Sequence, residues 1–205
     1  MADNEKWIND TALLFYQIFS VDYEDAAFLS KLLAGGGGNS TLCSTWTHLN
    51  GRFVKYRISK DAYELLLKKL GDEAKDMIRL EKGTVFVNKK VYKNHAKWFA
   101  DNAKGAENRE KAGKFFHFDH NPSNKKVLEL LNKKIKEHKN EDGFLKELAK
   151  YIKTVQTIDL ITIYEDDKRT STDLANPDGP LSSAERDKLL GTEFYDLVDE
   201  KPKKK

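Results

Sequence analysis

The segment Ile158–Tyr164, IDLITIY, constrains the fold of this chain more than any other part of the sequence. Four of its seven residues are β-branched, which is typical of a strand in a sheet. The segment runs directly into three acidic residues, Glu165, Asp166 and Asp167. Because helical patterns occur on both sides of it, we expect an α+β fold, a mixed helical domain that contains strands.

Apolar residues at helical spacing alternate with short strand-like segments along the rest of the chain. We expect helices at residues 10–19 (capped by Asn9 or Asp10), 26–33, 61–70 and 91–102, a helix capped by Ser123, a helix after the Asp142–Gly143 turn, and a short helix from Ser182. We expect strands at 52–58, 84–87 and 114–120. The four glycines at 35–38 are not followed by the Lys-Ser/Thr of a phosphate loop, so they are interpreted as a flexible connector.

The composition favours one folded domain. A chain of 205 residues with 39% hydrophobic side chains can bury a core, and we divide it into parts at 1–112 and 113–200 and a disordered basic tail at 201–205. No run approaches the roughly 20 apolar residues of a membrane-spanning helix, and the N-terminus lacks the pattern of a secretory signal. We therefore expect a cytoplasmic protein with no membrane partner. The single cysteine, Cys43, excludes an intramolecular disulfide and a cysteine-built zinc site.

The charges are unevenly distributed, although the net charge is only +3. Residues 82–114 contain nine Lys or Arg against three Asp or Glu, whereas residues 157–200 contain four against twelve. A basic middle beside an acidic C-terminal third suits a polyanion-binding face next to a cation-binding site. The alternative is that these charges only solvate the outer faces of helices.

Reactive side chains concentrate in two places, the strand end His117–His120 (HFDH) and the acidic run that follows Tyr164. Carboxylates at strand ends can hold a hard cation such as Mg²⁺. An imidazole with a pKa near neutrality can take a proton from water for attack on a phosphodiester. The alternative is a surface strand that ends in Asp-His by chance.

Residues Phe116–Pro122, FHFDHNP, resemble the first strand of the His-Me finger nucleases, also called ββα-metal or HNH-like, in which Asp-His is followed closely by Pro. The second half of that motif, a strand and a helix, falls without gaps on Thr157–Thr170, with Arg169-Thr170 where Lys-Thr is usual. The arrangement is similar to certain type II restriction endonucleases of this superfamily, in which helices separate the two strands. The resemblance covers Phe115–Thr170.

The resemblance implies a role for each matching residue. His120 would be the general base that activates water, and Asp119 the first ligand of one divalent cation, Mg²⁺ or Mn²⁺, in each active site. Asp166 stands at the second ligand position, with Glu165 as a near substitute. Arg169 would neutralise a phosphate. The implied fold is a ββα-metal nuclease core in the 113–200 part.

The sequence departs from the family pattern at several points. Thr157 stands where an Asn usually holds the loop and orients the base, so it is assigned a supporting role. The gap between His120 and Thr157 is longer than the usual loop. The Cys pairs that bind structural zinc in many relatives are missing, so no structural zinc is expected.

Strand alternation raises a question about the two histidines. It places His117 and Asp119 on one face of the strand and His120 on the other. For Asp119 and His120 to serve one site the strand must end or twist here, and Pro122 makes this plausible. His117 is either a third ligand or a hydrogen-bonded supporting residue. Asn124 is either a contact of the site or a helix-surface residue.

The basic stretch Lys89–Lys114 interleaves lysines with aromatic residues that we assign to the core. Lysine and arginine contacts to phosphates supply most of the sequence-independent affinity for DNA. Lys93 and Lys97 are four residues apart and would share one helix face. The expected backbone contacts, which make 1–112 a DNA-gripping part, are Lys89, Lys90, Lys93, Lys97, Arg109 and Lys111.

Together these patterns predict a divalent-metal-dependent DNA endonuclease, most specifically a type II restriction endonuclease that cuts double-stranded DNA. Palindromic sites mirror two-fold symmetry, so a homodimer is expected. The alternatives are a non-catalytic DNA-binding or structural phage or host protein and a non-specific nuclease of the same fold.

Overall fold

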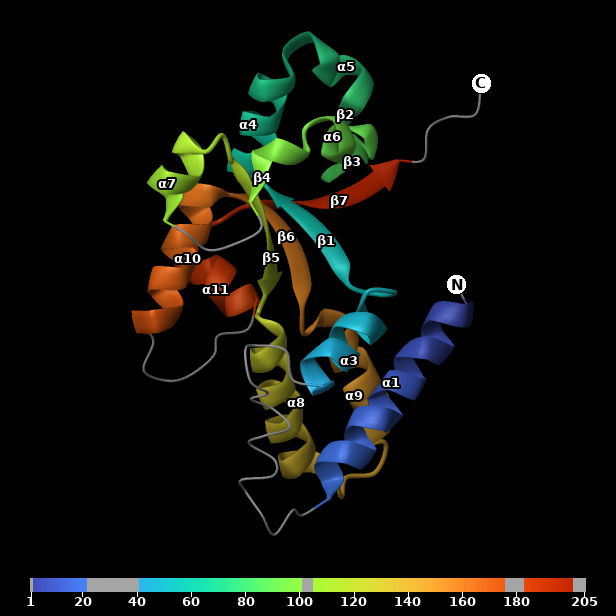
Figure 1. The fold of residues 1–205 in the computed structure, drawn as a ribbon. Coiled ribbons are helices and arrows are strands. Elements are labelled where there is room, and N and C mark those ends of the chain that lie inside the picture. Colours follow the sequence, from blue (N-terminus) through green and yellow to red (C-terminus); the bar gives the residue numbers. More distant parts are fainter. Residues whose placement is uncertain (1, 22–40, 101–104, 176–182, 201–205) are drawn as a thin grey trace. The chain divides into compact units, whose positions relative to one another are not determined.

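The computed structural model describes residues 2–21, 41–100, 105–175 and 183–200 (Figure 1). The chain forms two compact units, and each is built from two separate stretches of sequence. Residues 1–54 and 122–156 form the helical unit, and residues 55–121 and 157–205 form the sheet unit. The chain passes between the units three times, so this division does not follow the expected boundary between residues 112 and 113.

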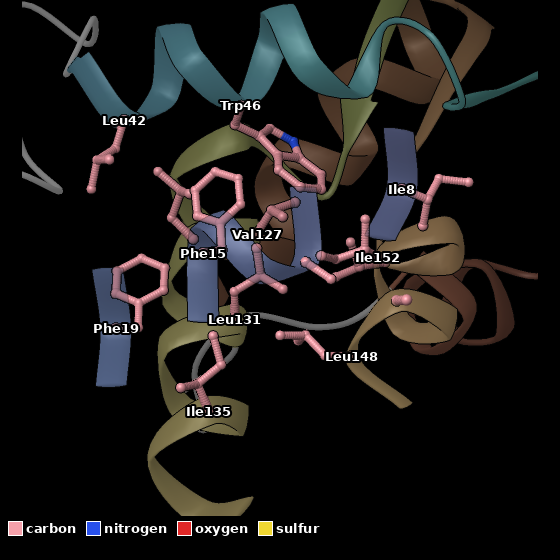
Figure 2. Close-up of a cluster of buried hydrophobic side chains, with 14 of the residues drawn as sticks. Ile8, Phe15, Phe19, Leu42, Trp46, Val127, Leu131, Ile135, Leu148 and Ile152 are labelled. Atoms are coloured by element: carbon pink, nitrogen blue, oxygen red, sulfur yellow. The ribbon is translucent and has the colours of Figure 1, made fainter. Parts of the chain in front are cut away.

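The described part of the helical unit contains α1 (Ala2–Ser20), α3 (Thr41–Asn50), α8 (Asn124–His138) and α9 (Phe144–Thr154). Their apolar faces meet in one core, which Figure 2 shows in close-up. Trp46 of α3 is fully buried in this core, and its ring meets Phe15 of α1 edge-on at 5.6 Å between centroids. The remaining labelled residues of the core are Ile8, Phe19, Leu42, Val127, Leu131, Ile135, Leu148 and Ile152.

Local sequence signals explain where α8 begins and which face it buries. The Ser123 hydroxyl accepts a hydrogen bond from the Lys126 backbone N–H, which is the expected N-cap. Val127, Leu131 and Ile135, at helical spacing, are all buried. In contrast, α1 begins at Ala2, so neither Asn9 nor Asp10 caps it as we expected.

A buried amide ties the segments of the helical unit together. The Gln156 side-chain oxygen accepts hydrogen bonds from Trp46 Nε1 at 2.8 Å and from Asn50 Nδ2. Its Nε2 donates to the Pro122 carbonyl at 2.7 Å and to Asn124 Oδ1 at 2.9 Å. These four bonds satisfy the buried amide, which would otherwise be costly to remove from water.

The sheet unit is built on a seven-stranded mixed sheet in the order β2-β3-β7-β1-β6-β5-β4. The strands are β1 (Lys55–Ser59), β2 (Ile78–Glu81), β3 (Thr84–Asn88), β4 (Phe99–Ala100), β5 (Phe116–Asn121), β6 (Thr157–Thr162) and β7 (Phe194–Glu200). β1 pairs with β6 in parallel and with β7 antiparallel, and β5 and β6 are antiparallel neighbours. The fold therefore combines helices with a mixed sheet, which is consistent with the expected α+β class.

The helices that the structure describes in the sheet unit are α4 (Lys60–Leu70), α5 (Ala74–Met77), α6 (Lys90–Asn94), α7 (Ala106–Lys111), α10 (Ile163–Ala175) and α11 (Ser183–Leu190), with 3₁₀ turns at Gly71–Glu73 and Ala96–Trp98. The expected helix at 91–102 is wrong. The chain there forms α6, a 3₁₀ turn and then β4, in which Phe99 pairs with Phe116 of β5. Hydrogen bonds from a distant strand override the local helical pattern.

The two faces of the sheet differ in chemistry. On one face, Ile58, Leu160 and Phe116 are completely buried and pack with Leu66 of α4. We call this the apolar face. The register places the charged and polar residues of the neighbouring strands on the opposite face, which we call the polar face: Arg57 of β1, Asp159 of β6, and His117, Asp119 and Asn121 of β5.

Three predictions fall on residues outside the described ranges, namely the helix at 26–33, the glycine connector at 35–38 and the tail at 201–205. Within the described part of the chain, no helix is long and apolar enough to cross a membrane.

Candidate metal centre

Two antiparallel strands and the helix that follows them position the centre. Asp119 on β5 lies opposite Asp159 on β6, and α10 begins at Ile163, directly after β6. A reciprocal capping box starts this helix. The Glu165 N–H donates to Thr162 Oγ1 at 3.2 Å, and Glu165 Oε2 accepts from the Thr162 N–H at 2.8 Å. The cap fixes the first turn of α10, which carries Asp166.

His117, Asp119 and Asp166 come together at this point. Each offers a ligand atom, and the three atoms lie within 4.8 Å of one another. Ligands of an octahedral Mg²⁺ site lie about 2.1 Å from the ion, which places them roughly 3–4 Å from one another. Small side-chain adjustments would therefore suffice for these residues to coordinate one ion.

The ring of His117 has a backbone partner at one of its two nitrogens. Its Nδ1 lies 3.2 Å from the carbonyl oxygen of Ala100 on β4. A carbonyl oxygen only accepts, so Nδ1 is the protonated nitrogen, and in the neutral tautomer Nε2 carries the lone pair. Metal-binding histidines usually donate their other ring N–H to such a partner.

A buried arginine holds Asp166. Arg109 of α7 is 4% exposed, and its Nη1 donates to Asp166 Oδ2 at 2.6 Å. Its Nη2 donates to Asp167 Oδ1 at 2.6 Å and to the Ile163 carbonyl at 3.1 Å. Figure 1 shows α7 beside α10, as these contacts require.

Asp159, at the centre of the polar face, is fully buried. Its carboxylate accepts Arg57 Nε and Nη2, both at 2.8 Å, Asn121 Nδ2 at 2.9 Å and Arg169 Nη1 at 3.0 Å. Burial by itself raises the pKa of Asp159, but the hydrogen bonds and charge of Arg57 and the charge of Arg169 outweigh it and lower the pKa overall. Asp159 is therefore an ionised carboxylate.

Arg169 of α10 connects this buried carboxylate to the centre. It is 2% exposed, and its Nη1 also donates to Asp119 Oδ2 at 3.0 Å. Its Nη2 lies 3.5 Å from Asp187 Oδ1 on α11. Arg169 thus reaches three carboxylates from one position. Arg169 is buried and paired with carboxylates, and its expected role toward a phosphate stays a prediction.

The cluster carries an excess of negative charge. Arg57, Arg109 and Arg169 face the carboxylates of Asp119, Asp159, Asp166, Asp167 and Asp187. Three guanidinium groups against five carboxylates leave a formal charge of −2, which favours a divalent cation.

His120 lies on the other face of the sheet. β5 continues in regular pairing through Asn121, and His120 is opposite Ile158. The expectation that the strand ends or twists after Asp119 is therefore wrong. Burial lowers the pKa of His120, and the Asp119 carboxylate offsets part of this effect. The histidine that the structure brings to Asp119 and Asp166 is His117.

The other expected site residues have different partners. Glu165 is not part of the three-residue group, because its carboxylate caps α10 and accepts from Ser59 Oγ at 2.7 Å. Thr157 is buried at the start of β6, with Oγ1 3.5 Å from the Asn121 carbonyl. Asn124 belongs to the helical unit, where its Nδ2 donates to Thr47.

The expected DNA contacts fall into two groups. Arg109 was wrongly assigned, because it is buried and ion-paired within the sheet unit. Lys89, Lys90, Lys93, Lys97 and Lys111 are exposed. Among these, Lys89 lies 3.4 Å from Asp199 on β7. The break between α6 and the 3₁₀ turn places Lys93 and Lys97 on two different elements.

Sequence reasoning missed Arg57, Asn121, Asp159 and Asp187. One signal could have found Asp159, because it is the one charged residue in the apolar segment IDLITIY. A carboxylate inside a buried strand requires a cationic partner. The strand pattern alone could not say that this partner is Arg57, which is 102 residues away.

Comparisons of the chain with protein-family models, with curated proteins and with solved structures found no match.

Proposed function

We propose that this chain is a divalent-metal-dependent nuclease that hydrolyses phosphodiester bonds in DNA. The observation that carries the proposal is the convergence of His117, Asp119 and Asp166 on one point of the sheet unit. Two further features support it. The elements follow the order strand, antiparallel strand, helix, and the surrounding cluster has a formal charge of −2.

The donor set fits a hard cation. Asp119 and Asp166 would supply carboxylate oxygens and His117 its Nε2 to one Mg²⁺ or Mn²⁺. When bound, such an ion acidifies a water and offsets charge on the phosphate. Arg109 and Arg169 each hold one of the two carboxylates by an oxygen, which restricts the rotation of those side chains.

The proposal assigns the histidine of the site to His117 instead of His120. His117 shares the polar face with Asp119, and its Nδ1 is engaged by the Ala100 carbonyl. His120 is on the apolar face, and its lowered pKa reflects burial there. A base role for His120 would require a rearrangement of β5.

The more specific proposal is a type II restriction endonuclease that cuts double-stranded DNA as a homodimer. It rests on the resemblance of Phe116–Pro122 and Thr157–Thr170 to that group of enzymes, and on the exposed lysines of α6 and its neighbours as contacts to phosphates. Discrete fragments from a plasmid digest would support the restriction enzyme, and a smear would indicate a non-specific nuclease.

One observation favours the non-catalytic alternative. Both acidic residues of the candidate centre already accept a hydrogen bond from a buried guanidinium. Ion-pair networks of this kind also occur where they serve stability alone. In that case the chain would bind DNA without cleaving it.

Metal binding and cleavage separate these functions. We would titrate the full chain with Mn²⁺ by calorimetry and incubate it with plasmid DNA in Mg²⁺ or in EDTA. Asp119→Asn should weaken Mn²⁺ binding and cleavage together. Asp196→Asn is the matched control, because Asp196 is on β7 and pairs with the exposed Lys55. The proposal fails if the wild-type chain binds no Mn²⁺ and leaves the plasmid intact.

A further inference from the structure

Three donor groups from three different elements converge on the carboxylate of Asp187. Arg57 Nη1 of β1 lies 2.7 Å from Asp187 Oδ2. Asn121 Nδ2 of β5 lies 3.3 Å and Arg169 Nη2 of α10 lies 3.5 Å from Asp187 Oδ1. Two guanidinium groups and an amide N–H around one oxyanion are the donors that recognise a phosphate.

Asp187 belongs to a helix that is weakly packed. None of the α11 side chains that the structure describes is buried, and Leu189 is 64% exposed. Buried apolar contacts from these side chains therefore do not hold α11 on the polar face. The ion pairs of Asp187 with Arg57 and Arg169 are among the contacts that hold α11 there.

The charge around this position repels an incoming anion less when Asp187 leaves. Arg57 and Arg169 are balanced by Asp119 and Asp159, so these four residues are formally neutral. Asp187 makes the group negative, which repels a phosphate. The side chain of Arg57 is 16% exposed and that of Asp187 15%, so the site opens to solvent on their side.

We propose that Arg57, Asn121 and Arg169 form a phosphate-binding site that Asp187 occupies as an internal substitute, and that a phosphate of the nucleic acid binds there when α11 lifts. The proposal rests on the proposed function, because Arg169 also holds Asp119 of the candidate metal centre. It adds a regulatory contact, since the chain blocks its own phosphate site.

Inorganic phosphate is the probe. We would titrate the full-length chain with phosphate in metal-free buffer at constant ionic strength, using calorimetry. Asp187→Asn keeps the shape and removes the charge, and it should bind phosphate at least about tenfold more tightly than the wild type. Asp196→Asn removes the same charge from an exposed pair on β7 and should change the affinity by less than about twofold. Adding Arg57→Gln to Asp187→Asn should abolish the gain.

A gain in affinity is a result that a purely structural Asp187 would not produce. Unchanged or weaker phosphate binding by a folded Asp187→Asn protein would overturn the proposal. If that variant does not fold, the proposal is tested instead by hydrogen exchange of the wild-type protein with and without phosphate. Saturating phosphate should then accelerate exchange of the α11 amides, and an unchanged rate would overturn the proposal.

The outcome is independent of the test of the metal centre. If the chain binds Mn²⁺ but Asp187→Asn does not raise the phosphate affinity, the proposed nuclease function stands and the proposal that Asp187 occupies a phosphate site fails. If Asp187→Asn raises the phosphate affinity but the chain binds no Mn²⁺, the proposed phosphate site stands and the proposed nuclease function fails.

Discussion

Replacing Asp159 by Asn should destabilise the sheet unit by about 3 kcal/mol. Three donors converge on Asp159 Oδ2, and Arg57 Nε approaches Oδ1. An amide has one oxygen and one NH₂ group, so whichever way it is turned its NH₂ faces at least one guanidinium N–H. Breaking a buried ion pair by removing one partner typically costs about 3–5 kcal/mol. We expect a cost at the lower end of this range, because Arg57 still pairs with Asp187 and Arg169 still pairs with Asp119 in the variant.

Urea unfolding followed by circular dichroism measures this loss, provided that the dependence on urea concentration keeps its slope. A loss of about 3 kcal/mol corresponds to a fall in Tm of roughly 6–12 °C for a chain of this size. Native-state hydrogen exchange of β1 and β6 amides would assign the loss to the sheet unit. Asp196→Asn, at an exposed ion pair, should cost less than about 1 kcal/mol. Equal effects of the two substitutions would refute the argument from burial.

The effect of Asp159→Asn should depend on pH with a definite sign. The pKa of Asp159 is lower in the folded protein than in the unfolded chain. Its charge therefore stabilises the fold fully above the unfolded pKa of about 3.9, and this contribution is lost as the pH falls through the folded pKa. The difference in unfolding free energy between wild type and variant should shrink in acid. A difference that stays constant down to pH 2 would contradict an ionised Asp159.

Three further tests address other parts of the structure. His117→Ala should weaken Mn²⁺ binding at least about tenfold in calorimetry, whereas His120→Ala should leave it unchanged; the reverse result would place the centre on the other face of β5. Lys93→Ala or Lys97→Ala should each make the slope of log DNA affinity against log salt shallower by about 0.9, and an unchanged slope would mean that the lysine does not contact a phosphate. Gln156→Leu should destabilise the helical unit by about 3 kcal/mol in urea unfolding, because it leaves several buried donors and acceptors unpaired, and a neutral effect would show that they find other partners.

Much of the local structure could be predicted because its signals are local. Val127, Leu131 and Ile135 share a helix face whatever the rest of the chain does, and Ser123 caps that helix from an adjacent position. The strand around Ile158 follows from its β-branched residues in the same way. In each case the determining residues lie within one element.

Elements that depend on distant partners could not be predicted in this way. The segment 91–102 has apolar residues at helical spacing, but Phe99 pairs with Phe116 and the helix stops. β7 was missed altogether, because its acidic sequence FYDLVDE becomes a strand only between β1 and β3. Pairing with other strands determines the secondary structure of both segments, and this pairing cannot be read from a single sequence.

The same limit applies to the candidate site. The resemblance to the His-Me finger motif selects Asp119 and Asp166 from the sequence, and the structure brings them together. Arg109 looked like a surface residue because its neighbours in sequence are charged and exposed, but its partner Asp166 is 57 positions away. The contact between Arg57 and Asp187 spans 130 positions. The burial of an arginine depends on carboxylates that only the tertiary fold supplies.

The position of β7 has a consequence for biosynthesis. Of the strands that the structure describes it is the last to leave the ribosome, yet in Figure 1 it lies between β3 and β1. Until Phe194–Glu200 has been translated, β1 and β3 each keep an unpaired edge that can associate with other chains. A nascent chain that still lacks this strand would therefore carry two separate pieces of the sheet, β2-β3 and β1-β6-β5-β4. Stop codons or proteolytic cuts just before Phe194 should yield insoluble products, although every residue of the candidate metal centre has already been made.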